Sequence, residues 1–392
     1  MKKSCLALCL LTMSSIVVAD KAVDEIIRKH LDKYSEAEHF SAIQVSVKAG
    51  QSIDNYAAGL RAFDEGSAPV KTTDLFDIGS ITKSFTAVLA VLAEREQKLE
   101  LTRTLGDYLE DYPHWGELTL TGLLNMSTGI PNYSDAPKIN YLMSTRMEQY
   151  WSTEDLIGLV YSRTFNPPRK PGYFYSNTGY ILMDMILNER YGDSYTHLLN
   201  TKIIKPLALR NTFYPVPDYS GQVLKRMAHG YSYNIYDNPE LLGRDVTKNN
   251  LSWAGAAGAI VANSEDVVRW VDNLFVGDKL LTEAEKRTMQ TLVSTRDGKP
   301  ISQTDKKHPQ GFGLGIIEAY REPIGRYWFY EGETLGYRAL YMYVPCNKVI
   351  IAALFNSATN GENDHAGELV QTLYQHVLEQ NKQLICQEPN VI

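Results

Sequence analysis

Residues 76–95 read FDIGSITKSFTAVLAVLAER, and this stretch decides the fold of the 392-residue chain. From residue 81 onward it is rich in helix formers and largely apolar, which predicts a buried helix rather than a surface one. The chain is long enough for two domains of typical size or for one large enzyme domain with an insertion. Either arrangement can bury such a helix in a substantial core.

Strand and helix patterns elsewhere in the chain predict what covers this helix. Apolar and polar residues alternate at 43–47, and a turn at 50–52 allows residues 53–60 to return as a second strand. The other predicted elements are a helix at 23–34, helices broken by Pro- and Gly-bearing loops at 104–215, a helix at 264–275, a hairpin at 339–355 and a closing helix at 368–379. This order predicts an α+β fold, in which one antiparallel β-sheet is flanked by N- and C-terminal helices and carries a helical insertion region.

The composition is that of a folded globular chain, with 44% apolar and 22% charged residues, which excludes collagen-like, coiled-coil and disordered chains. The net charge of −7 gives no electrostatic reason to expect a nucleic acid or an anionic membrane as partner. We expect residues 20–392 to form one domain, with an α/β part at about 20–80 and 250–392 and a mainly helical part at about 81–249.

The first nineteen residues have the pattern of a secretory signal peptide. Lys2 and Lys3 form a positive region, residues 6–18 a mostly apolar run, and small residues end at a predicted cleavage site after Ala19. A membrane anchor is the alternative, but the run is shorter than the roughly 20 residues of a spanning helix. We therefore expect a periplasmic or secreted protein with no membrane span after signal cleavage.

The four cysteines divide between the signal and the mature chain. Cys5 and Cys9 leave with the signal, so the exported protein keeps Cys346 and Cys386. An oxidising compartment allows one bridge between them, and two unrelated thiols are the alternative. The sequence leaves this open, because the Cα separation decides it.

Metal and cofactor motifs are missing from the sequence. The eight histidines form no HExxH motif and no close cluster with cysteine, and there is no GxSxG elbow. Gly311, Gly313 and Gly315 only loosely resemble a dinucleotide loop, since the residues after them do not read as a helix. These glycines are better explained by a close neighbour, so we predict neither a metal nor a cofactor.

Ser80 and Lys83 carry the sharpest chemical signal. A spacing of three places the hydroxyl and the amine on one helical face, where a neutral amine can activate the serine as a nucleophile. The positive end of the helix dipole would also lower the pKa of the lysine. The alternative is that Ser80 is only a helix cap, and a serine and lysine at this spacing occur about once or twice by chance in such a chain.

A tyrosine and an asparagine provide a second motif, Tyr175-Ser176-Asn177, between a Pro-Gly turn at 171–172 and a strong helix. A phenol next to an ammonium has its ionised form stabilised, so Tyr175 beside Lys83 can accept the serine proton and return it to the leaving group. Another such triplet, at 236–238, lies in a tyrosine-rich loop. Protonation in a coupled pair is shared, so the base is not assigned to one residue.

Several stretches occur together with these motifs and in a fixed order. They are FDIGSITK at 76–83, LLNMSTGI at 123–130, PGYFYSNTGY at 171–180, KPL at 205–207, and AGAAG at 254–258 before SED at 264–266. In this set the chain resembles the penicillin-binding serine hydrolases grouped with class C β-lactamases, over about residues 24–380. Met126 departs from the family, in which a histidine is common at that position.

The resemblance implies a site between the sheet and the helical region. Ser80 is then the acylated nucleophile, Lys83 and Tyr175 are its proton-transfer partners, and Asn177 is an orienting and substrate-binding amide. The family also has a third motif, on a strand that lines the cleft. This motif consists of Lys or His, then any residue, then Gly.

In this chain the third motif is Tyr330-Glu331-Gly332. Gly332 is kept, so the resemblance implies that the backbone N–H of Glu333 joins that of Ser80 as an oxyanion hole, where one donor is worth about 3 kcal/mol of barrier. Tyr330 offers a neutral hydroxyl in place of a cation, and Glu331 and Glu333 make the strand acidic. Arg338 offsets this charge only if its side chain lies on the same side of the sheet.

These features favour a small ester or peptide amide as substrate, such as a carboxylic ester, a D-amino-acid peptide or a compound with a free amine, hydrolysed through an acyl-enzyme. A β-lactamase or penicillin-binding protein with weak turnover is the alternative, with β-lactams as acylating ligands. A binding protein that keeps the fold without turnover is the alternative from another class. The tyrosines of the 213–245 loop either line an aromatic wall for the substrate or make ordinary loop packing: Tyr214, Tyr231, Tyr233 and Tyr236.

Overall fold

The computed structural model describes residues 21–164, 166–233, 239–359 and 363–386. The predicted signal peptide and the triplet at 236–238 lie outside the described residues. Within them, no helix has the length and apolar character that crossing a membrane requires.

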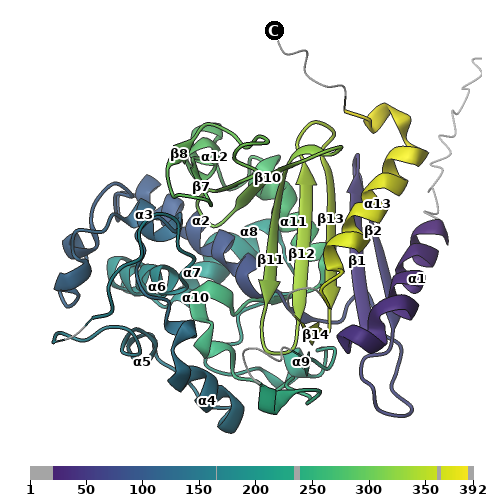
Figure 1. Cartoon of the computed structure of the whole chain (residues 1–392), viewed down its shortest axis with the longest axis horizontal. Helices are drawn as coiled ribbons and strands as arrows, with labels where there is room; N and C mark the ends of the chain where they lie inside the picture. The colour runs from purple at the N-terminus through teal and green to yellow at the C-terminus, as the bar shows by residue number, and fades with distance from the viewer. Residues whose placement is uncertain (1–20, 165, 234–238, 360–362, 387–392) are drawn as a thin grey trace, which may run out of the picture.

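A nine-stranded sheet with antiparallel neighbours forms the centre of the molecule (Figure 1). Its strand order is β2-β1-β13-β12-β11-β10-β9-β7-β8, so the first strand of the chain pairs with one of the last. The strands are β1 (Ala42–Ala49), β2 (Ser52–Gly59), β7 (Leu292–Ser294), β8 (Pro300–Ile301), β9 (Gln310–Phe312), β10 (Ile317–Arg321), β11 (Gly325–Glu333), β12 (Arg338–Val344) and β13 (Val349–Phe355). The two predicted hairpins are confirmed as β1–β2 and β12–β13.

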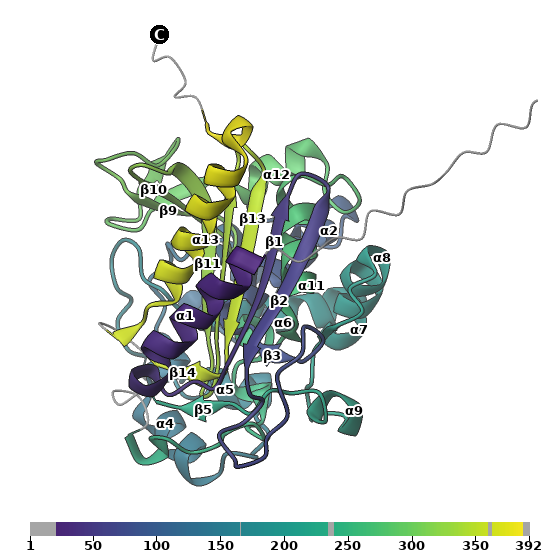
Figure 2. The ribbon, with the colours of Figure 1, turned by 90° about the vertical axis from the view of Figure 1, so that its right-hand side faces the viewer.

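The helices from the two ends of the chain, α1 (Lys21–Glu38) and α13 (Ala366–Gln380), cover one face of this sheet (Figure 2). Their apolar stripes pack on the sheet through residues such as Ile27 and Leu373, which share a core with Ile351 of β13. Both terminal helices were predicted from their apolar periodicity, and both are confirmed.

The opposite face of the sheet carries the larger core and the remaining helices (Figure 1). Helix α2 (Thr82–Arg95) lies in its middle, and residues 82–93 are all buried, which confirms the predicted buried helix. Because β12 and β13 have helices on both faces, every residue of the two strands is buried. The longer helices here are α6 (Thr178–Tyr191), α11 (Ser264–Phe275), α4 (Pro137–Thr145) and α12 (Glu283–Met289).

Short elements connect the large ones. The short helices are α3 (Leu120–Leu124), α5 (Thr153–Ile157), α7 (Tyr195–Leu199), α8 (Lys205–Leu207), α9 (Gly221–Leu224) and α10 (Gly255–Gly258). Two small sheets join β3 (Phe76–Asp77) and β4 (Thr212–Phe213) to β6 (Val261–Ala262), and β5 (Tyr231–Ser232) to β14 (Ser357–Ala358). The predicted α+β fold is confirmed, and these small sheets are additions that the sequence patterns did not predict.

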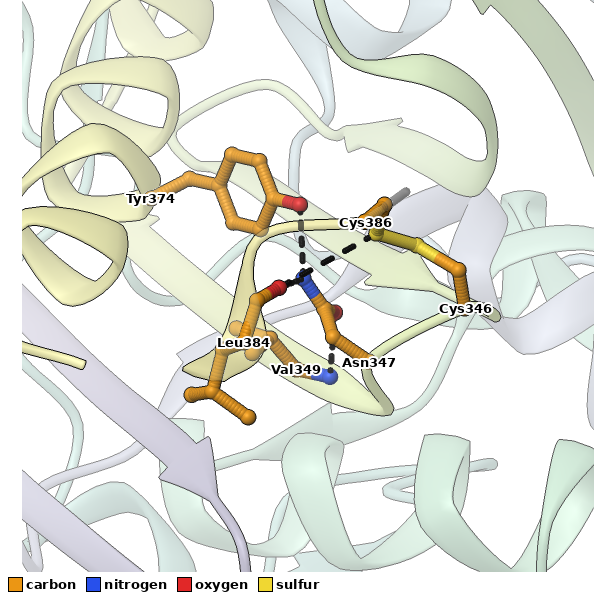
Figure 3. Close-up of a disulfide and its surroundings, with 6 residues drawn as sticks. All are labelled: Cys346, Asn347, Val349, Tyr374, Leu384 and Cys386. Atoms are coloured by element: carbon orange, nitrogen blue, oxygen red, sulfur yellow. Dashed lines mark hydrogen bonds between the residues drawn. A yellow bond between two sulfur atoms is a disulfide. The ribbon is translucent and has the colours of Figure 1, made fainter. Parts of the chain in front are cut away.

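A disulfide ties the end of the chain to the sheet. Cys346 in the β12–β13 turn bonds Cys386 beyond α13, with the two Cα atoms 5.9 Å apart (Figure 3). Asn347 reinforces this closure, since its Nδ2 donates to the hydroxyl of Tyr374 and to the carbonyl of Leu384. Of the two alternatives that the sequence left open, the structure has the bridge.

Candidate active site

Ser80 lies on a tight turn just before the buried helix. Residues Gly79–Ile81 form one 3₁₀ turn, and Gly79 adopts a left-handed φ of 48°, which glycine adopts readily. The N-cap of α2 is Ile81, without a side-chain capping bond. The alternative of Ser80 as a simple helix cap is therefore wrong, and its hydroxyl is available for other partners.

The Oγ of Ser80 receives two hydrogen bonds from the other motif residues. The Nζ of Lys83 donates from 2.9 Å, and the hydroxyl of Tyr175 donates from 2.8 Å. Lys83 also donates to the carbonyl oxygen of Ala257 at 2.8 Å, in the AGAAG stretch on α10. The predicted nucleophile and its two predicted proton-transfer partners thus meet at one atom, although Tyr175 is far from the other two in sequence.

Lys83 is fully buried, and burial lowers the pKa of its amine below the ordinary 10.5. The direction agrees with the expectation from the helix dipole, but the main cause here is loss of solvent. Gly315 packs against the backbone of the same residue, because a Cβ at that position would lie 2.6 Å from the carbonyl oxygen of Lys83. The close neighbour expected of that glycine is the backbone of α2.

The loop that carries Tyr175 is fastened to a neighbouring loop at 131–134. The backbone N–H of Asn177 donates to Oδ1 of Asn132 at 3.0 Å, and its Nδ2 donates to Oγ of Ser134 at 2.9 Å. The Oδ1 of Asn177 is buried and has no hydrogen-bond partner within the described ranges. Asn132 and Ser134 were not predicted, because a Pro-Asn loop reads as an ordinary turn.

Gly332 of β11 touches the backbone that carries the nucleophile. A Cβ at residue 332 would lie 1.9 Å from the oxygen of Ile78 and 2.9 Å from the nitrogen of Ser80, while one at Gly79 would lie 2.4 Å from the nitrogen of Glu333. The two glycines therefore bring the backbone nitrogens of Ser80 and Glu333 to the same place. This is the arrangement that an oxyanion hole needs.

Tyr330 points to the same face of β11 as Gly332, since side chains alternate along a strand. Its hydroxyl lies 3.4 Å from that of Tyr175, and its ring packs edge-on against Phe312 with centroids 5.9 Å apart. Burial raises the pKa of Tyr330 well above 10. The third motif thus places a neutral phenol, not a cation, next to the proton carriers.

Glu331 and Glu333 alternate to the α13 side of the sheet. They line a cavity of about 490 Å³ together with Ser80, Arg338 and Asp364. Burial, and the charge of Asp364, raise the pKa of Glu331 above its usual 4.5. Three carboxylates and one guanidinium thus line the cavity beside Ser80.

Arg338 lines this cavity but is held by other carboxylates. Its guanidinium donates to Glu38 and to Asp364, each at 2.8 Å, and to the carbonyl oxygen of Ser357 at 3.0 Å. It is only 3% exposed. Its charge is therefore balanced by the carboxylates of Glu38 and Asp364.

Three tyrosines of the 213–245 loop pack on other aromatic rings. Tyr214 contacts the ring of Tyr195, and Tyr231 and Tyr233 both pack on His39. Tyr236 lies outside the described residues. Among the described tyrosines the alternative of ordinary packing holds, and an aromatic wall at the nucleophile does not form.

Comparison with known proteins identifies the family of the chain. A family model described as Beta-lactamase matches residues 27–375. The chain belongs to the β-lactamase family. Its members and neighbours are serine hydrolases, so the predicted family and enzyme class are confirmed.

The relatives within this family differ in what they act on. The chain is 23% identical over 335 residues to penicillin-binding protein 4* of Bacillus subtilis, covering 83% of this chain and 71% of the relative. It is 24% identical over 207 residues to the teichoic acid D-alanine hydrolase of Staphylococcus aureus, covering 53% of this chain and 48% of that protein. The solved structure of the D-amino acid amidase of Ochrobactrum anthropi, complexed with L-phenylalanine, superposes on this chain with a TM-score of 0.76. The two are 20% identical, and the superposition covers 92% of this chain and 99% of the amidase. This similarity shows that the two proteins share a fold.

Proposed function

We propose that this protein hydrolyses esters or amides of small amino acids that carry a free amine, D-amino acids in particular, through an acyl-enzyme on Ser80. The observation that carries the proposal is the convergence of the Lys83 amine and the Tyr175 hydroxyl on the Oγ of Ser80, at 2.9 and 2.8 Å. These distances are those of a nucleophile within hydrogen-bond reach of its base.

The chemistry follows from this arrangement. The Oγ of Ser80 attacks the substrate carbonyl carbon, and its proton passes to the pair formed by Lys83 and Tyr175. The carbonyl oxygen becomes an oxyanion that accepts from the backbone N–H groups of Ser80 and Glu333. When the tetrahedral intermediate collapses, the bond to the leaving group breaks and that group takes the proton. Water then attacks the acyl-enzyme by the same route and releases the acid.

The lowered pKa of Lys83 supports its part in this sequence, because only a neutral amine can accept a proton. Since Lys83 and Tyr175 share one hydrogen-bonded site, the proton belongs to the pair rather than to either residue. Asn177, which is fastened to Asn132 and Ser134, is proposed to orient and bind the substrate.

The choice of substrate rests on the charges around the nucleophile. Tyr330 is neutral where a cation would attract the carboxylate of a β-lactam, and Arg338 is already bonded to Glu38 and Asp364. The cavity at Ser80 is lined by Glu331, so it attracts an ammonium and repels a carboxylate. A teichoic acid D-alanine hydrolase and a D-amino acid amidase among the similar proteins support an aminoacyl substrate.

The first test removes the nucleophile. Ser80→Ala is expected to lower hydrolysis of p-nitrophenyl acetate by more than about 1,000-fold with no change in the unfolding transition. Ser220→Ala, which removes the cap of α9, serves as the matched serine control and should keep the wild-type rate. A Ser80→Ala variant that retained turnover would remove this serine from the mechanism.

The second test compares substrates. D-Alanine p-nitroanilide is expected to be cleaved at least about tenfold faster than its N-acetyl derivative, and Glu331→Gln is expected to reduce this preference. L-Alanine p-nitroanilide tests the stereochemistry. If the protein hydrolysed nitrocefin faster than either anilide, the β-lactamase alternative would be favoured. If the intact mass of the protein were unchanged after exposure to a fluorophosphonate and to a penicillin, the binding-protein alternative would be favoured.

We also propose that the protein is exported and that its mature chain begins after Ala19. The signal-like pattern of residues 1–19 supports this, and so does the bridge between Cys346 and Cys386, since such bridges persist in oxidising compartments. Mass spectrometry of the protein from its native host is expected to find an N-terminus at Asp20. An intact N-terminus in the cytosolic fraction would contradict export.

A further inference from the structure

Asp77 is a buried carboxylate three residues before the nucleophile. It lies on β3 and is 3% exposed. Its Oδ2 accepts from Oγ1 of Thr334 at 2.8 Å, and its Oδ1 accepts from the hydroxyl of Tyr219 at 3.2 Å. The reaction proposed above does not use this carboxylate. Burying a carboxylate nevertheless costs free energy unless its hydrogen bonds compensate for the lost solvation.

Thr334 is the residue that directly follows Glu333. Its backbone N–H donates to the carbonyl oxygen of Tyr337 at 3.1 Å, which closes a turn after β11. The bond between Asp77 and Thr334 therefore joins the backbone before Ser80 to the backbone after Gly332, directly behind the contact of Gly332 with Ile78. Two segments that each supply one oxyanion donor are tied together by one carboxylate.

We propose that Asp77 is a positioning residue, which holds the backbone N–H of Glu333 in the oxyanion hole through Thr334. The inference rests on the proposed function, because it requires an oxyanion at Ser80. It adds a residue that touches neither the substrate nor the reacting atoms.

The ionisation of Asp77 bears on this role. Burial raises its pKa to about 7, and the hydrogen bonds from Thr334 and Tyr219 lower it only in part. The titratable groups that face it are the phenols of Tyr219 and Tyr337, whose pKa values are raised well above 10 by burial, so they stay neutral. As the pH falls through about 7 the carboxylate takes up a proton and loses acceptor capacity toward Thr334.

The test compares Asp77→Ala and Thr334→Val, singly and together, with wild type. Each single variant is expected to lower kcat for p-nitrophenyl acetate about 10- to 100-fold with little change in KM, since a displaced oxyanion donor affects the transition state more than the ground state. Phenylboronic acid, which forms a tetrahedral adduct on the serine, should bind at least about tenfold more weakly. In the double variant, kcat should fall by no more than in the more impaired single variant, because both substitutions break the same hydrogen bond between Asp77 and Thr334.

Asp184→Ala is the matched control. Asp184 on α6 is buried as well, burial raises its pKa to about 7, and it accepts from Asn188 rather than from a residue near Ser80. We expect this variant to lose stability but to keep kcat and boronate affinity. Asp77→Asn, which keeps the shape without the charge, should remove an ionisation near pH 7 from the rate profile that wild type and Asp184→Ala retain.

Two results would overturn the inference. One is a Thr334→Val variant with wild-type kcat and boronate affinity, and the other is a loss of kcat in Asp184→Ala as large as in Asp77→Ala. Failure of the proposed function would look different, because wild type and Ser80→Ala would then show the same rate and neither would bind the boronate. That outcome would overturn both proposals, whereas Ser80-dependent turnover that survives Thr334→Val overturns only this one.

Discussion

Gly332→Ala is expected to inactivate the site while leaving the protein folded. A Cβ at residue 332 would lie 1.9 Å from the oxygen of Ile78, whereas real Cβ contacts are not shorter than 3.0 Å. The strand β11 and the backbone before Ser80 therefore have to separate by about 1.1 Å. Because a misplacement of about 1 Å costs about 100-fold in rate, we expect kcat to fall by about that factor. Overpacking should lower the unfolding free energy by about 1–3 kcal/mol.

The assay pairs p-nitrophenyl acetate hydrolysis with urea unfolding. Gly221→Ala is the control, because a Cβ at residue 221 on α9 meets no atom within 4 Å and its φ is not left-handed. It should match wild type in kcat and unfold at the same or a slightly higher urea concentration, because alanine favours a helix more than glycine does. A Gly332→Ala variant with kcat within about threefold of wild type would refute the reasoning, since it would show that the predicted 1 Å separation does not occur or does not matter.

Three further predictions concern buried groups and the disulfide. Lys83→Met is expected to lower kcat by about 100- to 10,000-fold. Because burial lowers the pKa of Lys83, the neutral amine forms below pH 10.5. The wild-type rate should therefore rise with pH below 10.5, and the variant should lack this rise in a pH–rate profile. Cys346 and Cys386 are 40 residues apart, so reducing their bridge should lower the unfolding free energy in urea by about 4 kcal/mol. The same treatment should leave kcat unchanged. Equal stability with and without reductant would contradict this prediction. Arg338→Leu should cost about 3–5 kcal/mol in urea unfolding by leaving the buried carboxylate of Glu38 without the guanidinium, while Arg28→Leu, in an exposed pair, should have no measurable effect.

The secondary structure was predictable where one segment contains its own signal. The buried helix at 82–95, the hairpin that ends at residue 355 and the two terminal helices follow from apolar periodicity and turn residues within a few positions. The short strand β3 was not predictable, because two residues carry no periodic pattern and pair only once β6 has folded beside them.

The site was predictable in its residues but not in its contacts. Asn132 and Ser134 hold the Tyr175 loop across about 45 positions of sequence, and no local pattern marks them. Glu331 is recognisable as a charge on a strand, but alternation alone does not say which face it takes. Arg338 is balanced by Glu38 from 300 positions away, so its neutralisation was not readable either.

The sequence by itself determined the nucleophile and its amine, because Ser80 and Lys83 lie one helical turn apart and the helix geometry brings them together wherever it packs. Only the tertiary structure decided that the phenol of Tyr175, the backbone of Glu333 and the cavity lined by Glu331 lie beside Ser80. These positions depend on how β11, the Tyr175 loop and α13 pack around α2, and packing between distant segments is set by the whole core rather than by any one stretch of residues.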